Sequence, residues 1–427
     1  MSGRPERRPD VTVWCRTVDG GVQLRLTAAD GSASLTVGLA APDVLRACHH
    51  KFGRAIGAAA DRCRTGRSLP VNAAADALST MARAGRVFLS EALLDPEADL
   101  YRMSRFLRES CPTWRTRTPH TPLIHVLARS DQYFPWELVP LFDPVTRGRA
   151  RDVAELAQVA SAFTGFAVVV ERSDPDRPVD DSTLDGWDRL PLRMMYDSRY
   201  PGAQQELGFF RGRGDLVRLR GPYPRDVGDE TAPTVARQLC DPTLGVDGRP
   251  DGPLDQVVHF SCHCEGVGDG DRMPGYRLAD EQGREVMLLL DDLVDELMRI
   301  WADPDSSPPP DRRPPMPLVF LNACGTAALD PATATSLLKP FAQNRNRGII
   351  GTAANVPDGA AAAVSRWFYT NLLAHGMDVG QALHAAKWRL LQDWGNPLGL
   401  LYSVHAYAGL RVAPVPTYAV PVPGGDA

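Results

Sequence analysis

Two reactive side chains follow short apolar strands in the C-terminal half of the chain. His263 comes directly after VVHFSC, and Cys324 comes directly after VFLNA. In open α/β sheets the functional sites lie at the carboxyl ends of strands, so both residues are expected at one edge of a sheet. A thiol beside an imidazole is the simplest activated nucleophile, because the imidazole takes the proton and the thiolate attacks. The small residues Gly325 and Thr326 would let a carbonyl reach the backbone amides of an oxyanion hole.

The residues around His263 also allow other interpretations. His259 lies in the middle of the strand, where we expect a buried, hydrogen-bonded, structural histidine. With Cys262, His263 and Cys264 it suggests a zinc site, but alternation along a strand puts the histidines on one face and the cysteines on the other. The CxxC pairs typical of structural zinc are missing, and the segment GVGDGDRMPG lacks the closing glutamate of a calcium loop. We therefore expect neither a metal nor a cofactor.

Strands and helices alternate from residue 190 onward, which predicts an α/β fold with a mostly parallel sheet covered by helices on both faces. The apolar runs place strands at 192–196, 216–220, 256–262, 317–323 and 347–352. Amphipathic periods place helices at 231–241, 291–302, 357–374 and 378–393. Residues 303–317 hold seven prolines in fifteen positions and are expected to form an extended, exposed linker.

The N-terminal part shows no catalytic constellation. Residues 11–40 alternate weakly around two turn signals, which predicts a small antiparallel meander, and 42–111 carry helical periods. We interpret 1–115 as a β-plus-helical accessory region, 116–412 as the catalytic domain and 413–427 as a proline-rich tail.

Composition narrows the class of protein. The 427 residues are 44% hydrophobic and 23% charged, with a net charge of −5, which fits a soluble globular protein and gives no basic footprint for direct nucleic-acid binding. No run approaches the roughly 20 apolar residues of a membrane span, and the N-terminus lacks the apolar core of a secretory signal. Eight scattered cysteines without such a signal are typical of reduced, buried thiols. We expect a cytoplasmic protein.

Four segments together resemble the CHAT family of caspase-like cysteine peptidases, whose clan also holds caspases and separases. They are FPWELVP at 134–140, VHFSCH at 258–263, FLNACGT at 320–326, and the stretch 348–391 beginning GIIGTAANVPDG. The resemblance spans about 116–412 and implies a caspase-haemoglobinase-like fold. It also implies His263 as general base, Cys324 as nucleophile, and the backbone amides of Cys264 and Cys324 as the oxyanion hole. Pro135, Trp136 and Glu137 match a family motif that we interpret as structural.

Some positions depart from the family pattern or bear on specificity. The family usually has glycine where this chain has Cys264, whose side chain restricts the backbone dihedrals. Asp197, just past a strand, is the candidate orienter of the histidine. Asn322, two residues before the nucleophile, is expected to line the pocket for the substrate residue preceding the scissile bond. Arg199 would favour an acidic residue there; we predict that Asn322 dominates and that an uncharged residue is preferred.

The resemblance implies an endopeptidase that cuts protein substrates. Bacterial relatives act in defence and conflict systems in which an upstream sensor switches on the peptidase, so residues 1–115 could dock or inhibit. Two other interpretations stay open: a catalytically silent CHAT-like scaffold that binds a partner protein, and another thiol hydrolase on the same fold, such as an amidase.

Overall fold

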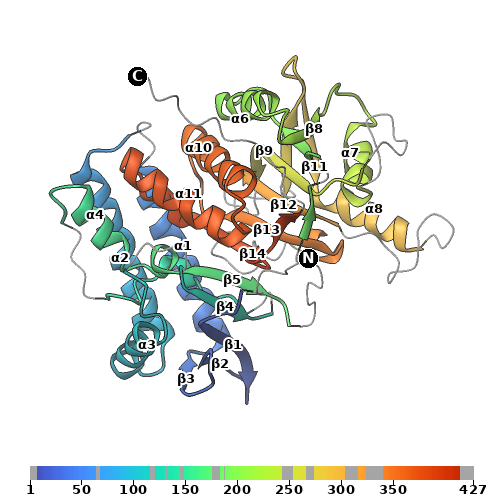
Figure 1. Ribbon diagram of the computed structural model, residues 1–427. Coiled ribbons are helices and arrows are strands. Elements are labelled where there is room, and N and C mark those ends of the chain that lie inside the picture. The colour runs from blue at the N-terminus through green and yellow to red at the C-terminus, as the bar shows by residue number, and fades with distance from the viewer. Residues whose placement is uncertain are drawn as a thin grey trace.

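In the computed structural model the fold is built around one large sheet with helices on both faces (Figure 1). The structure describes residues 7–63, 68–115, 121–129, 132–144, 149–175, 183–186, 188–242, 253–265, 274–302, 316–323 and 340–413. Within these residues the main sheet has thirteen strands, most of which pair in parallel, and β6 and β15 pair separately.

The C-terminal half supplies the strands that matter for the candidate site. Its strands are β7 (Leu190–Tyr196), β8 (Val217–Tyr223), β9 (Val257–Glu265), β10 (Gly275–Ala279), β11 (Glu285–Leu289), β12 (Met316–Ala323), β13 (Asn346–Thr352), β14 (Tyr402–Ala406) and β15 (Arg411–Ala413). Its helices are α6 (Pro201–Gly212), α7 (Thr231–Cys240), α8 (Leu290–Ala302), α10 (Asp358–Tyr369), the π-helical turn η3 (Thr370–Ala374), α11 (Val379–Trp394) and the 3-10 turn η4 (Pro397–Leu401). The strands run side by side as β8, β7, β9, β12, β13, β14, and the β10–β11 hairpin pairs with the end of β9.

Alternate residues of the central strands enter different layers, as period-2 strands buried on both faces must. Val258, Phe260 and Val319 pack with α7 and α8, whereas Val257 and Phe320 pack in the larger core beneath α6, α10 and α11. The α/β fold predicted from the sequence, with a mostly parallel sheet flanked by helices, is therefore confirmed.

The five predicted strands and four predicted helices of this half are present, with ends that differ by a few residues. The prediction of an exposed linker over 303–317 is wrong for its last two residues, because Met316 and Pro317 begin β12; residues 303–315 lie outside the described part. The helix predicted over 357–374 closes with the π-helical turn η3. The sequence analysis did not predict α6, β14 or the β10–β11 hairpin, because the hydrophobic periodicity of these segments is weaker.

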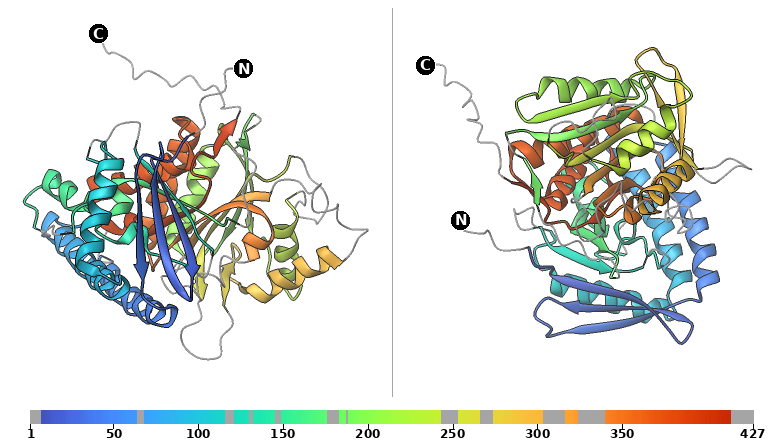
Figure 2. Two further views of the ribbon diagram at one scale, coloured as in Figure 1. Left: turned by 90° about the horizontal axis from the view of Figure 1, so that it is seen from below. Right: turned by 90° about the vertical axis from the view of Figure 1, so that its right-hand side faces the viewer.

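The N-terminal meander extends the same sheet. Residues 7–115 form β1 (Val11–Val18), β2 (Gly21–Ala28), β3 (Ser34–Leu39), α1 (Pro42–Asp61), α2 (Val71–Ala92) and α3 (Pro96–Ser110). The intervening part adds β4 (Leu123–Leu127), the 3-10 turn η1 (Trp136–Leu138), α4 (Val153–Ala160), α5 (Thr164–Ala167), β5 (Val169–Ser173) and β6 (Thr183–Asp185). The predicted antiparallel meander is confirmed, but β1 also pairs in parallel with β4, so the sheet crosses the predicted boundary at residue 115 (Figure 2). One hydrophobic core contains side chains from both sides of that boundary.

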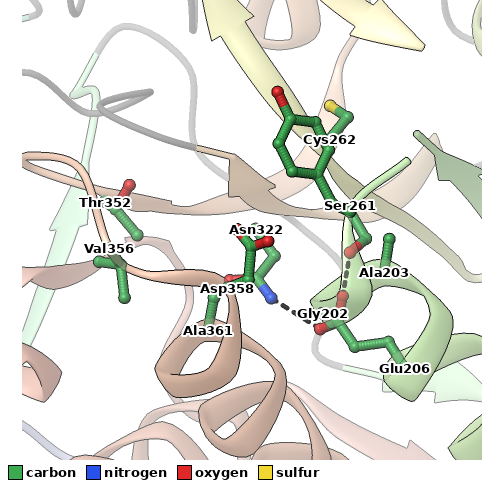
Figure 3. Close-up of a pocket in the computed structure, with 11 residues that line it drawn as sticks. Gly202, Ala203, Glu206, Ser261, Cys262, Asn322, Thr352, Val356, Asp358 and Ala361 are labelled. Carbon is green, nitrogen blue, oxygen red and sulfur yellow. Dashed lines mark hydrogen bonds between the residues drawn. The ribbon is translucent and has the colours of Figure 1, made fainter. Parts of the chain in front are cut away.

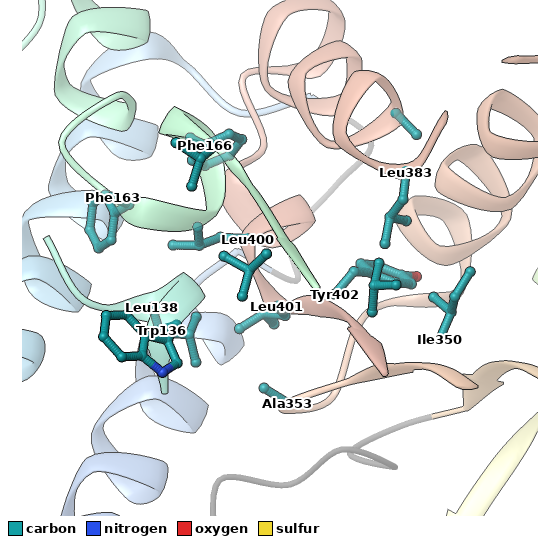
Figure 4. Packing of buried hydrophobic residues seen from close by; sticks show 14 of the residues in the cluster. Trp136, Leu138, Phe163, Phe166, Ile350, Ala353, Leu383, Leu400, Leu401 and Tyr402 are labelled. Carbon is teal, nitrogen blue, oxygen red and sulfur yellow. The ribbon is translucent and has the colours of Figure 1, made fainter. Parts of the chain in front are cut away.

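The PWE motif lies inside this shared core. Trp136 is fully buried, and Figure 4 shows it beneath Leu400 and Leu401 of η4. Glu137 accepts two hydrogen bonds from the buried guanidinium of Arg172, which also donates to the Phe134 carbonyl oxygen. Buried charges need such pairing. These contacts agree with a structural role for the motif.

None of the described helices is both long enough and apolar enough to cross a bilayer.

Candidate active site

The pairing of β9 with β12 brings together the strand ends that precede His263 and Cys324. Asn322 lies beside Ser261, and Ala323, the last residue of β12, lies beside Cys262. The two strands are parallel and in register; the described part of β12 ends at Ala323, whereas β9 continues through His263 to Glu265 in its ladder with β10. Cys324 itself, with Gly325 and Thr326, lies outside the described residues.

His263 lies within β9, two residues before the strand ends, is partly exposed to solvent and belongs to the ladder with β10. Arg277 is its cross-strand neighbour, and the Tyr200 ring lies 6.3 Å from the imidazole ring, centre to centre. Burial, and then the positive charge of Arg277, lower the pKa of His263 from its ordinary value of 6.5, although Asp197 and Asp358 act in the opposite direction. The imidazole is therefore neutral at neutral pH and able to accept a proton.

Asp197 and Arg199 form an ion pair with each other. The fully buried Asp197 carboxylate accepts from Arg199 Nε at 2.9 Å and from Arg199 Nη2 at 2.6 Å. The remaining Arg199 nitrogen, Nη1, donates to Glu285. Among the described residues no hydrogen bond joins Asp197 to His263, so its influence there is electrostatic, and Arg199 has its guanidinium already engaged by two carboxylates.

Glu206 of α6 links the two strand ends from below. Its carboxylate is 1% exposed; one oxygen accepts from the Ser261 hydroxyl, and the other accepts from Asn322 Nδ2 at 2.6 Å (Figure 3). His259 Nε2 lies 3.3 Å from the same carboxylate. Burial by itself would raise the pKa of Glu206, but the His259 imidazole and the donated hydrogen bonds outweigh it and hold the pKa below its ordinary value. A carboxylate thus sits under the edge of the sheet.

The contacts of His259 and Asn322 complete this network. His259 is fully buried, with Nδ1 3.1 Å from the Tyr369 hydroxyl, so the predicted structural, hydrogen-bonded role is confirmed. Asn322 Oδ1 accepts from the Tyr402 hydroxyl at 2.7 Å. Both ends of the Asn322 amide therefore already have partners inside the protein.

A small pocket opens between the strand ends and the first turns of α6 and α10 (Figure 3). Ser261 and Cys262 of β9 and Asn322 of β12 form one side, and Glu206 and Asp358 face it from the two helices. Asn322 is among the residues that line this pocket, whereas Arg199 is not; that Asn322 lines the pocket for a substrate residue stays a prediction.

The cysteines of this strand point away from the imidazole. Cys262 and Cys264 are buried in the core beneath α7 and α8, and the backbone of Cys264 pairs with Tyr276 of β10. The seven cysteines of the described residues are all buried thiols. Within the same residues no group of three or more His, Cys, Asp or Glu side chains could hold a metal ion.

Sequence reasoning missed Glu206 and Asp358. A signal for Glu206 existed, because Ala203, Leu207 and Phe210 form an apolar face of α6 and Glu206 occupies that face. A glutamate on a buried face needs partners, and such residues are functional-site candidates. Nothing comparable marks Asp358, which is one of many acidic residues in a first helical turn.

Comparison with known proteins identifies the region that contains this site. Residues 248–399 match the CHAT domain family. This part of the chain is similar to a CHAT domain. The matched segment includes β9, β12, β13, α10 and α11.

Two further comparisons gave matches that are shorter or lower in sequence identity. A probable protease from Vitiosangium sp. (strain GDMCC 1.1324) is 31% identical over 126 residues, which are 29% of this chain and 15% of that protein. The chain therefore spans only a small part of the length of this relative. Two structures of the Saccharomyces cerevisiae separase–securin complex superpose with a TM-score of 0.47 at 8% and 7% identity, covering 93% of this chain and 30% of that one.

Proposed function

We propose that the chain is a cysteine endopeptidase in which His263 and Cys324 form the catalytic dyad. The observation that carries the proposal is the register of β9 and β12, which places Ala323 beside Cys262 and so brings the residues preceding Cys324 and His263 together. The CHAT domain spans both positions, and the relative from Vitiosangium bears the name of a probable protease.

The chemistry needs only the two side chains and water. His263 takes the thiol proton, and Cys324 Sγ attacks the peptide carbonyl carbon. His263 then gives that proton to the leaving amine as the C–N bond breaks, which leaves a thioester. The imidazole next removes a proton from water, the hydroxide displaces the sulfur, and the acid product and free thiol are formed. Backbone amides of Cys264 and Cys324 would hold the oxyanion.

The lowered pKa of His263 supports its role as base. Burial and Arg277 keep the imidazole neutral at neutral pH, and a neutral imidazole is the form that accepts the thiol proton. Glu206 supports the dyad indirectly, because its hydrogen bonds to Ser261 and Asn322 fix the spacing of the strand ends.

The setting of the enzyme is part of the same proposal. We infer a cytoplasmic, bacterial peptidase of a defence system that acts on a protein substrate and is switched on by a sensor protein. The buried thiols of the described residues agree with a reducing compartment. The accessory part, residues 7–115, is packed against the CHAT-containing part through β1 and β4, so a sensor that displaced it would disturb the sheet carrying the site.

Labelling with a thiol-directed peptide electrophile tests the proposal. The unmodified protein is expected to be labelled at Cys324, and Cys324→Ala and His263→Ala are each expected to lose both labelling and peptide cleavage. The matched control is Cys240→Ala, which removes a buried thiol on α7 far from the strand ends. Cleavage by Cys324→Ala would overturn the proposal, and a stably folded protein that never cleaves or reacts would favour the silent scaffold.

A further inference from the structure

The pocket beside His263 is in the right place to receive a substrate side chain. It begins where β9 and β12 cease to pair, with Ser261 and Asn322 on its wall, and Tyr200, whose ring lies 6.3 Å from the His263 ring, also lines it. A substrate whose scissile carbonyl lies between the residues after these two strands would therefore direct its preceding side chain here. This step rests on the proposed function.

The charged groups of the pocket are all of one sign. Glu206 forms its floor and Asp358 its rim on α10, and no arginine or lysine is among the described residues that line it. The two nearby arginines have carboxylate partners elsewhere: Arg199 pairs with Asp197 and Glu285, and Arg277 pairs with Glu265. Within the described part of the chain, the pocket thus carries negative charge that no arginine or lysine side chain neutralises.

Asp358 is the carboxylate of this pocket that has no side-chain partner among the described residues. It is half-buried, and the hydrogen bond that its carboxylate accepts comes from its own backbone N–H. Gly202 of α6 packs so closely on it that a Cβ there would lie 2.7 Å from the Asp358 carbonyl oxygen. Burial, and then the negative charge of Glu206, raise the pKa of Asp358. A cation in the pocket would relieve both effects.

The other polar groups cannot recognise a substrate equally well. The Asn322 amide is held between Glu206 and Tyr402, and the Ser261 hydroxyl donates to Glu206. An uncharged polar side chain would find these groups occupied, and an acidic one would meet two carboxylates. The sequence-based prediction of an uncharged residue before the scissile bond assigned the selecting role to Asn322 and did not include Glu206 or Asp358.

We propose that this pocket selects substrates with arginine or lysine before the scissile bond, and that Asp358 is the residue that pairs with the cation. Asp358 is thereby the specificity-determining residue and Glu206 the fixed negative floor beneath it. The class of substrate is a protein with an accessible basic cleavage residue.

The test uses matched peptidyl acyloxymethyl ketones whose last residue is lysine, arginine, norleucine or aspartate. Lysine and norleucine have similar shape and differ in charge, so their ratio reports electrostatic selection. Cys324 displaces the acyloxy carboxylate and forms a thioether, so labelling is measured by intact mass. The full chain is expected to react at least about tenfold faster with the lysine and arginine probes than with norleucine, and slowest with aspartate.

Variants separate selection from folding. Asp358→Asn should lower the lysine-to-norleucine ratio about tenfold, whereas Asp393→Asn, an exposed aspartate of α11, should leave the ratio as it is. Ala361→Lys adds a cation to the pocket wall and should also lower the ratio.

Two outcomes would overturn the inference while labelling at Cys324 upheld the proposed function. One is an equal or faster reaction of the norleucine probe with the unmodified chain. The other is an Asp358→Asn variant that slows both probes equally. Failure of all four probes to label Cys324 would overturn both.

Discussion

Two of the buried glutamates, Glu137 and Glu206, have different surroundings. Glu137, in the PWE motif, faces the fully charged guanidinium of Arg172, so the pair is close to neutral and fixes packing. Glu206, under the strand ends, is held by a hydroxyl, an amide and the His259 imidazole beside a pocket. A buried carboxylate with an arginine partner supports the core, whereas one satisfied by weaker donors keeps negative charge available at a site. By this criterion Glu137 has a structural role, and Glu206 belongs to the candidate site.

The largest effect is expected from breaking the Glu137 pair. Glu137→Ala leaves the Arg172 guanidinium buried without its partner, which should lower the free energy of unfolding by about 3–5 kcal/mol. Urea unfolding followed by circular dichroism measures the loss. Removal of both charges in Glu137→Gln with Arg172→Met should cost less than Glu137→Ala alone; equal or greater loss would contradict the pairing argument.

Glu206→Gln should act on catalysis more than on stability. The isosteric amide fills the same space but removes the charge that accepts from Ser261 and Asn322, so the strand ends are less firmly positioned. We expect kcat to fall about tenfold to a hundredfold, as displacements of about 1 Å can do. Glu296→Gln, a buried glutamate on α8 that pairs with Arg299, is the control and should keep kcat. Equal kcat losses in the two variants would show a general effect of folding.

Tyr402→Phe tests the outer end of the same network. It removes the hydroxyl that donates to Asn322 Oδ1 at 2.7 Å and leaves that buried oxygen without its donor. The expected cost is about 1–2 kcal/mol in the free energy of unfolding. Tyr101→Phe, at an exposed position, should change it by less than about 0.5 kcal/mol. A neutral Tyr402→Phe would mean that Asn322 is not fixed by this contact.

The smallest effect concerns the pH dependence of activity. Arg277 helps lower the pKa of His263, while Asp197 and Asp358 raise it. Arg277→Gln removes the positive charge and should raise that pKa, so the acid limb of kcat/KM should move up by about half a pH unit. Arg277→Lys should preserve the limb, and Arg389→Gln on α11 should not move it. A shift toward lower pH would contradict the assignment of His263 as base.

Much of the fold could be predicted because its signals are local. The continuous apolar runs of β7, β9, β12 and β13 lie within a few residues of their predicted limits, since strands covered on both faces need an apolar residue at nearly every position. The helices α7, α8 and α11 were equally clear from their period. By contrast, Glu206 lies on the buried face of α6 and interrupts the hydrophobic period of that helix. The helix was therefore not predicted from the sequence.

The sequence by itself determined the α/β class, the alternation that puts His259 on one face and Cys262 on the other, and the position of His263 near the end of a strand. These follow from residue type and from the two-residue period of a strand. Only the tertiary structure decided that β1 continues the sheet beyond the predicted boundary, that Arg199 is engaged by Asp197 and Glu285, and that Glu206 and Asp358 face one pocket. The partners in each of these contacts come from different elements of the fold. Their meeting depends on strand order and helix packing, which local sequence does not encode.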